Sequence, residues 1–179
     1  MSLYETTLTS ETLLEGYVFR VERQDVRLGD GSHGKRDIVR HIGGVGALAR
    51  KPCGTWVLVR QFRKAVDCEV TEIVAGMREP GEAPEDAIRR ELEEETGHLV
   101  EKLTPLGRAF ASPGYTDEVV HLFFAEISAE PGSNRLDHDE RVEVVEFSDA
   151  ELRRAIGENE LPDAKTMVAW MLACRKGLA

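Results

Sequence analysis

The segment from Pro84 to Gly97 constrains the fold most, because it predicts a helix with acidic side chains on its inward face. Proline at the start and glycine at the end are typical helix boundaries. At about 100° per residue, the apolar positions that share one inward stripe are Ile88, Leu92 and Leu99. Glutamates lie at the edge of that stripe or on the arc beyond it, namely Glu91, Glu94 and Glu95. A helix that only buried an apolar face would not carry acids there.

These carboxylates are unfavourably placed unless a cation neutralises them. Glu91 and Glu95 repel each other at i,i+4, in the half of the helix where its dipole favours cations. Carboxylates near a low-dielectric core cost free energy. One interpretation is a solvated acidic face paired with the nearby arginines Arg78, Arg89 and Arg90. The other is a metal site, because oxygen ligands at i, i+3 and i+4 suit a hard divalent cation such as Mg²⁺.

Composition limits the classes of function. The 179 residues fit one domain, and 33 Asp plus Glu against 23 Lys plus Arg give a formal net charge of -10. This acidity argues against nucleic acid as a partner. No uncharged stretch approaches the roughly 20 residues of a membrane span, and no signal peptide is expected. The three scattered cysteines, Cys53, Cys68 and Cys174, favour a reducing compartment, so we expect a cytoplasmic protein.

Strand and turn signals predict a mixed α/β domain of the α+β class. The expected strands are residues 17–21, 37–40, 43–48, 56–60, 69–74, 103–110, 119–127 and 142–147. A capping box at Ser148 and Glu151 predicts a helical C-terminus. The residues that repeat there at helical spacing are Met167, Trp170, Met171 and Cys174. Residues 1–42 are expected to form a β arm, and residues 43–179 the main domain.

The residues around the predicted helix resemble the Nudix box. Its pattern is Gly, five residues, Glu, seven residues, then Arg-Glu-apolar-any-Glu-Glu-any-Gly-apolar. Here it runs from Gly76 through Glu82 and Arg90 to Gly97, and only the last apolar place departs, where His98 stands. The resemblance implies a Nudix-type α/β/α sandwich with a mixed sheet. It also implies a hydrolase of nucleoside diphosphates linked to another moiety.

Carried over to this sequence, the resemblance implies a divalent metal site. The ligands implied for Mg²⁺ or Mn²⁺ are Glu91, Glu94, Glu95 and the carbonyl of Ala75. Glu94 and Glu95 are also expected to be catalytic, because the metal would polarise phosphorus and activate the attacking water. Glu82 and Arg90 would form an ion pair that fixes the loop before the helix.

Three stretches outside the box resemble the ADP-ribose pyrophosphatase branch. The first, Arg60-Gln61-Phe62-Arg63, lies on the strand before the box, and Arg63 is the expected phosphate ligand because a guanidinium matches a pair of phosphate oxygens. The second is Val74-Ala75-Gly76 with Glu72 before it. The third, Ser112 to Glu118, resembles the proline-containing loop of ADP-ribose hydrolases, in which Glu118 would accept hydrogen bonds from the terminal ribose.

The N-terminal arm also matches this branch, whose members usually form homodimers by exchanging it. The resemblance implies that Tyr17 or Phe19 stacks on adenine, with Arg36 nearby. Met77, beside the first glycine of the box, is a further expected substrate contact. The alternative for the aromatic residues is a place in the core or in an interface.

The acidic loop before the last predicted strand is the expected source of the general base. Glu140 aligns best with the acidic position of this branch, whereas His138 stands where some members have glutamate, and Asp139 lies between them. Such a group would orient or deprotonate the attacking water, or hold a third metal. A solvated loop without a catalytic part is the alternative.

We therefore expect metal-dependent hydrolysis of ADP-ribose to AMP and ribose 5-phosphate by a homodimer. One alternative is hydrolysis of another nucleotide sugar, such as a GDP- or UDP-sugar. The alternative from a different class is a Nudix fold that binds ADP-ribose without cleaving it. The complete set of box glutamates favours an enzyme.

Overall fold

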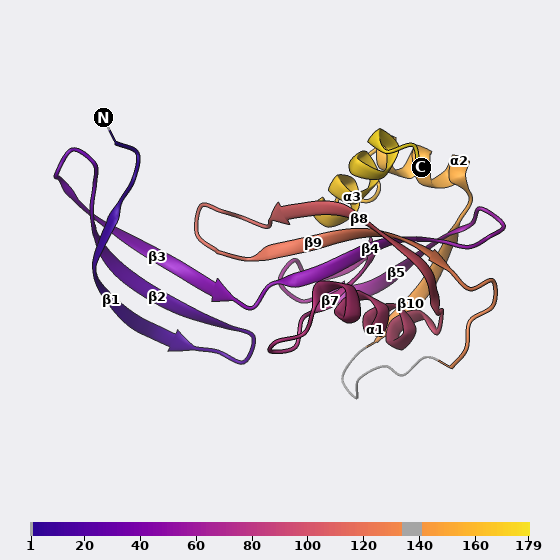
Figure 1. Ribbon diagram of the computed structural model, residues 1–179, viewed down its shortest axis with the longest axis horizontal. Helices are drawn as coiled ribbons and strands as arrows, with labels where there is room; N and C mark the ends of the chain where they lie inside the picture. The colour runs from indigo at the N-terminus through magenta and orange to yellow at the C-terminus, as the bar shows by residue number, and fades with distance from the viewer. Residues whose placement is uncertain (1, 134–140) are drawn as a thin grey trace. The chain divides into compact units, whose positions relative to one another are not determined.

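The computed structural model describes residues 2–133 and 141–179 of the chain, drawn in Figure 1. The described residues separate into two compact units. The first unit comprises Met1–Gly43 and Phe110–Val119, and the second comprises Gly44–Ala109 and Val120–Ala179. Within these residues, no helix is both long enough and apolar enough to cross a membrane.

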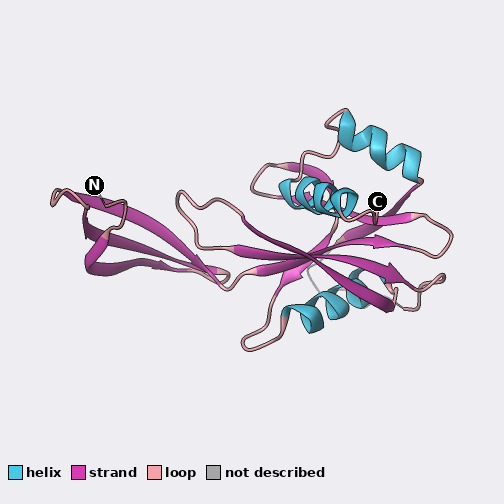
Figure 2. Ribbon diagram, turned by 45° about the horizontal axis from the view of Figure 1, so that its top comes forward, coloured by secondary structure: helices cyan, strands magenta, loops and turns pink. Residues whose placement is uncertain are grey.

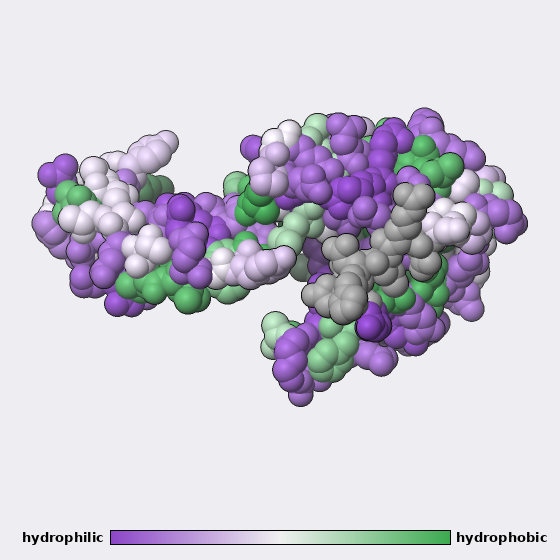
Figure 3. All heavy atoms as spheres, turned by 90° about the horizontal axis from the view of Figure 1, so that it is seen from below, coloured by the Kyte–Doolittle hydropathy of each residue, from purple (hydrophilic) through white to green (hydrophobic). Residues whose placement is uncertain are grey.

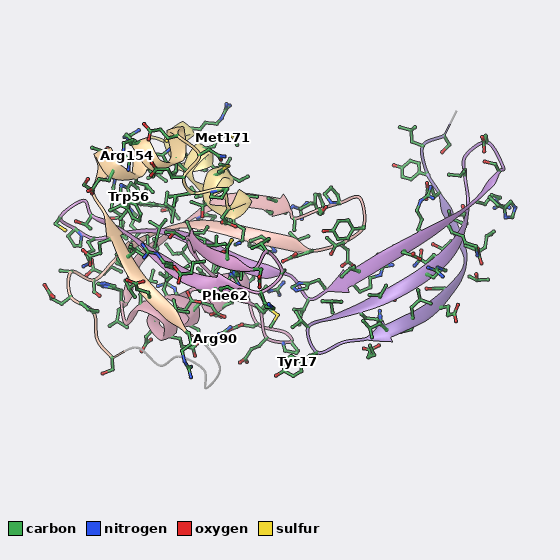
Figure 4. All side chains as sticks on the ribbon, turned by 180° about the vertical axis from the view of Figure 1, so that it is seen from behind. Tyr17, Trp56, Phe62, Arg90, Arg154 and Met171 are labelled. Atoms are coloured by element: carbon green, nitrogen blue, oxygen red, sulfur yellow. The ribbon has the colours of Figure 1, made fainter. Side chains whose placement is uncertain are left out.

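The first unit contains an antiparallel sheet in the order β1 (Thr6–Glu15), β2 (Phe19–Arg27) and β3 (His33–His41). Strand β1 was not predicted, because its threonine-rich sequence is exposed on both faces and so lacks an apolar alternation. The expected strand over residues 17–21 is wrong at its start. Tyr17 lies in the turn between β1 and β2 and is fully exposed (Figure 4), and the N–H of Gly16 closes that turn on the carbonyl of Phe19 at 2.9 Å.

The loop Ser112–Glu118 is bonded to β3 within the first unit. The N–H of Val39 donates to the carbonyl of Tyr115 at 2.7 Å, and the N–H of Asp117 donates to the carbonyl of Val39 at 3.2 Å. Arg40 Nη1 also donates to Asp117 Oδ2 at 3.0 Å. The loop that resembles the ADP-ribose branch therefore groups with the N-terminal strands.

The second unit is built on a mixed sheet. Its strand order is β10 (Val142–Phe147), β5 (Trp56–Arg63), β4 (Gly44–Arg50), β9 (Val119–Ile127) and β8 (Val100–Phe110). Strands β4 and β9 are parallel, whereas β5 is antiparallel to both β4 and β10. Two short strands extend this sheet, because β6 (Cys68–Glu72) pairs with β5 and β7 (Val74–Met77) pairs with β4.

The expected single strand over residues 69–74 is in fact two strands that meet at Ile73. Glu72 is in register with Val59 of β5, whereas Val74 is in register with Ala47 of β4. The chain changes partner strand between them. The N–H of Ile73 donates instead to Thr166 Oγ1 at 2.9 Å. This side-chain bond holds the segment that leads into the Nudix box.

Helices cover both faces of the mixed sheet, as Figure 2 shows. Helix α1 (Pro84–Thr96) packs Ala87, Ile88 and Leu92 into the core on one face. Helices α2 (Asp149–Gly157) and α3 (Ala164–Arg175) close the core on the other face. There, Trp56 makes edge contacts with Phe124 and Trp170 at ring-centroid distances of 6.0 and 5.5 Å. The expected α/β/α sandwich with a mixed sheet is confirmed.

The boundaries of α1 are as the sequence predicts, but one member of its inward stripe is wrong. Gly97 ends the helix in the left-handed conformation, with φ of 73°. The chain then turns away from the helical path, so Leu99 is 59% exposed. His98, the departure from the box pattern, is 1% exposed, and its Nδ1 lies 2.9 Å from the carbonyl oxygen of Ser128.

The C-terminal helices are also as predicted, with one shift of face. Ser148 and Glu151 form the expected capping box of α2. In α3, the residues that are buried are Thr166, Ala169, Trp170 and Ala173. Met171 points outward (Figure 4) and is 59% exposed, although it shares the helical spacing of the expected set. The inner face therefore combines one large residue, Trp170, with three small ones.

The bond between Thr166 and Ile73 yields a stability prediction. Thr166→Val keeps the shape of the side chain but leaves the buried N–H of Ile73 without its acceptor, which costs about 1–3 kcal/mol of unfolding free energy. Thr166→Ser keeps the hydroxyl and is expected to lose less. Urea unfolding followed by tryptophan fluorescence measures this, since both tryptophans lie in the second unit. A Thr166→Val protein as stable as the wild type would contradict the prediction.

Candidate active site

Arg90, labelled in Figure 4, is hydrogen-bonded to four other residues of the Nudix box. Its Nε and Nη2 donate to the two carboxylate oxygens of Glu82, each at 3.0 Å. Nη2 also donates to the carbonyl of Met77 at 3.1 Å. The hydrogen bonds that Arg90 donates to Glu82 raise the pKa of Arg90, and they lower the pKa of the Glu82 carboxyl. The ion pair thus ties the loop before α1 to both β7 and the helix.

The same guanidinium contacts two glutamates of α1. Nη1 of Arg90 donates to Glu91 Oε1 at 2.8 Å and to Glu94 Oε2 at 3.0 Å. Glu91 is 9% exposed, Glu95 is 3% exposed, and Glu94 is half-buried. Glu93 is exposed, as the helical phase predicts. The inward placement of Glu91 and Glu95 is therefore confirmed.

Gly76 allows the Glu91 carboxylate to approach the backbone of β7. A Cβ at position 76 would lie 2.1 Å from the carboxyl carbon of Glu91, so a side chain there would displace this carboxylate. Gly76 is in register with Val45 of β4, and the preceding Ala75 with Gly46. The glycine thus places a helix carboxylate directly against the strand that carries the carbonyl of Ala75.

The donor set fits a hard divalent cation. Three glutamates of one helix and a backbone carbonyl of the adjacent strand offer only oxygen ligands, which Mg²⁺ and Mn²⁺ prefer. Across residues 2–133 and 141–179, no three acidic, histidine or cysteine side chains converge closely enough to form a metal site as they stand. Arg90 holds two of these glutamates instead.

Arg63 lies at the end of β5 and is bonded to a buried carboxylate. Its Nε donates to Glu72 Oε1 at 2.7 Å, and Glu72 is 1% exposed. Burial lowers the pKa of Arg63, but the bond and charge of Glu72 outweigh burial, so the pKa is raised overall. The charge of Glu95 acts in the same direction. Arg63 therefore lies within electrostatic range of the box helix.

The remaining expected site residues fall in three places. Met77 is in β7 of the second unit, next to Gly76. The residues in the first unit are Tyr17, Phe19, Arg36 and Glu118. There, Arg36 pairs with Glu5, and Glu118 Oε1 lies 3.9 Å from Nδ1 of His41. The expected general base, Glu140, and its alternatives His138 and Asp139 lie outside the described residues.

Lys165 and Asp163, which were not predicted as site residues, form a polar group with Glu72, the partner of Arg63. Lys165 Nζ donates to Glu72 Oε2 at 2.9 Å and to Asp163 Oδ1 at 2.7 Å. Asp163 is the N-cap of α3, and its spacing of three residues from Thr166 is the signal that was available. The contact with Glu72 joins positions 93 residues apart, and no local pattern reports it.

Comparison with known proteins identifies relatives along most of the chain. The family described as NUDIX domain matches residues 40–170. The chain is 42% identical to "ADP-ribose pyrophosphatase" of Bacillus subtilis (strain 168), over 94% of this chain and 91% of that protein. It is 38% identical to "Methanol dehydrogenase activator" of Bacillus methanolicus, over 92% and 90% of the two chains.

Two further comparisons bear on fold and on the wider group. The chain is 34% identical to "GDP-mannose pyrophosphatase" of Yersinia enterocolitica, over 73% of this chain and 72% of that protein. A solved structure described as "Crystal structure of ADP compounds hydrolase" shares the fold, with a TM-score of 0.84, 22% identity and full coverage of both chains. Together with the intact box around Arg90, the family match over residues 40–170 shows that this chain belongs to the Nudix family.

Proposed function

We propose that this protein hydrolyses the diphosphate bond of ADP-ribose, giving AMP and ribose 5-phosphate. The observation that carries the proposal is the complete Nudix box, with the carboxylates of Glu91 and Glu95 on the buried face of α1. The 42% identity to an ADP-ribose pyrophosphatase over 94% of the chain favours this substrate. A binding module without catalysis would not need the full set of box glutamates.

The proposed cofactor is Mg²⁺ or Mn²⁺, held by the three box glutamates and the carbonyl of Ala75. A bound metal of this kind polarises the phosphorus atom and lowers the pKa of a water molecule. Arg90 prepares the site by holding Glu82, Glu91 and Glu94 in place before the metal binds. Glu95, buried on the same helix face, is the least exposed of the three box glutamates, and a charge acts more strongly where there is less solvent.

Arg63 is the proposed ligand of the diphosphate. Its Nε is bonded to Glu72, and its side chain is 40% exposed. The two Nη nitrogens of such a guanidinium can donate to a pair of phosphate oxygens. Further proposed substrate contacts, on the resemblance to this branch, are Met77, Glu118, Arg36, Tyr17 and Phe19.

A second candidate substrate class is a GDP-sugar. The observation that favours it is the 34% identity to a GDP-mannose pyrophosphatase over 73% of the chain. The box and Arg63 act on the diphosphate, which all nucleotide sugars share, so they do not choose between adenine and guanine. The choice depends on contacts to the base and the terminal sugar.

We propose that the protein is a homodimer and acts in the cytoplasm. Apolar side chains of the arm are exposed to solvent (Figure 3), namely Leu8, Leu13, Leu14, Val18 and Phe19. An isolated three-stranded sheet with so little buried surface gains stability when a partner covers it. Free Cys53 and Cys68 at the surface suit a reducing compartment.

A substrate panel tests the function. The purified protein is incubated with ADP-ribose, GDP-mannose, UDP-glucose and NADH in the presence of Mg²⁺, and the products are identified by chromatography. We expect the highest kcat/KM for ADP-ribose, with AMP and ribose 5-phosphate as products. A higher value for GDP-mannose would favour the second candidate, and tight binding of ADP-ribose without turnover would indicate a binding module.

Glu95→Gln tests the metal site. The change keeps the shape of the side chain but removes its charge, so we expect kcat to fall about 10²- to 10³-fold, typical of losing one preorganised electrostatic contact. Glu93→Gln is the matched control on the exposed face of the same helix, and its kcat is expected to stay near the wild-type value. An unchanged kcat for Glu95→Gln at saturating Mg²⁺ would refute the assignment.

Leu14→Asp tests the dimer. A charge on the apolar surface of the arm is expected to shift the sedimentation coefficient from a dimer towards a monomer and to lower activity at nanomolar concentration. Leu99→Asp is the control, because Leu99 is an exposed leucine of the second unit. A wild-type protein that sediments as a monomer and is fully active at nanomolar concentration would rule out the proposal.

A further inference from the structure

Arg63 is one of four charged side chains that are joined by ion pairs. We call them the Glu72 network: Arg63, Glu72, Lys165 and Asp163. Its centre is Glu72, at the end of β6 and 1% exposed. Oxygen Oε1 of Glu72 accepts from Arg63 Nε at 2.7 Å, and Oε2 accepts from Lys165 Nζ at 2.9 Å. The two oxygens of this carboxylate therefore accept hydrogen bonds from two different cations.

The network is anchored on the start of helix α3. Lys165 Nζ also donates to Asp163 Oδ1 at 2.7 Å, and the other oxygen of Asp163 accepts from the N–H of Thr166 at 2.8 Å. The hydroxyl oxygen of Thr166 in turn accepts a hydrogen bond from the N–H of Ile73, the residue after Glu72. Helix α3 thus holds both the side chain of Glu72 and the backbone next to it.

Ion pairs join the four members of the network. Burial lowers the pKa of Lys165, but Asp163 and Glu72 outweigh it and the pKa is raised overall. Burial raises the pKa of Asp163, and Lys165 outweighs it, so the pKa of that carboxyl is lowered overall. Two carboxylates and two cations balance each other, which is the condition for keeping charges in a buried place.

The Glu72 carboxylate is held from two sides. Lys165 Nζ is bonded to Oε2 and Arg63 Nε to Oε1, so Lys165 fixes the carboxylate that in turn holds Arg63. Among the described residues, Arg63 is held through Nε and its side chain is 40% exposed, which leaves its Nη nitrogens for an anion.

We propose that Lys165 is a positioning residue for the hydrolysis reaction. By holding the carboxylate of Glu72 in place, it fixes the Nε contact of Arg63 and so directs the outer nitrogens of Arg63 towards the diphosphate of the substrate. Lys165 itself does not contact the substrate and acts through Glu72 and Arg63. The inference rests on the proposed function in one respect, namely that Arg63 is a diphosphate ligand.

A double-mutant cycle tests this role. Lys165→Met and Lys165→Arg are made in the wild-type background, and Lys165→Met is also combined with Arg63→Gln. Lys102→Met is the matched control, since Lys102 forms an ion pair with Glu126 on the surface of the same unit. Circular dichroism and melting curves show which variants are folded at the assay temperature. The cycle uses whichever substrate of the panel has the highest kcat/KM. If ADP-ribose is not that substrate, the same variants are compared on the one that is.

We expect Lys165→Met to lower kcat/KM about 10-fold, the lower end for a weakened hydrogen bond between charged groups, mainly through a higher KM. The dissociation constant of the α,β-methylene analogue of the substrate, measured by calorimetry, is expected to rise by a similar factor. Lys165→Arg restores most of the loss, because arginine also bonds two carboxylates. In the Arg63→Gln background, Lys165→Met has little further effect, less than about twofold.

Three results would overturn the proposal. One is a Lys165→Met protein with wild-type KM and wild-type affinity for the methylene analogue. Another is an equal loss with and without Arg63, which would show that Lys165 acts on stability or on another group. If Arg63→Gln itself has no effect on KM or affinity, the diphosphate role of Arg63 fails, and the positioning role of Lys165 fails with it.

Discussion

The structure of the second unit depends on one arginine that makes an acidic helix compatible with a sheet. Helix α1 carries glutamates on the face that it buries, at positions where apolar residues would otherwise lie. Arg90 is bonded to Glu82, Glu91 and Glu94, so one guanidinium neutralises much of this charge and fixes the preceding loop at the same time. Without it, carboxylates close to a low-dielectric core would repel one another and favour unfolding.

Two features of the strands let this helix lie close to the sheet. Gly76 leaves room for the carboxylate of Glu91, which would have to move if position 76 carried a side chain. At Ile73 the chain changes partner strand. Before it, β6 pairs with β5, and after it, β7 pairs with β4 beneath the helix. Thr166 of α3 satisfies the backbone at that point from the other face of the sheet. The box entry is therefore held by both helical layers, which links the packing of α3 to the site.

Where the sequence-based predictions were right, the signals were local. Pro84 and Gly97 bound α1, and Ser148 with Glu151 caps α2, because a cap bonds within three or four residues. The errors arose where local pattern was weak or tertiary contacts decided. Strand β1 was missed because neither of its faces is buried within its own unit. Leu99 was placed inside because helical phase was extended past the left-handed turn at Gly97.

The sequence alone determined the family resemblance, the α/β/α layers and the inward position of Glu91 and Glu95. The inward position follows from spacing along one helix, where a residue's neighbours are fixed by the 3.6-residue period, and the layers follow from the family resemblance. Only the tertiary structure decided that Lys165 and Asp163 stand behind Glu72, and that the loop Ser112–Glu118 belongs with the N-terminal strands. Such pairings join positions far apart in the chain, and the folded path of the strands, not any local period, sets which of them meet.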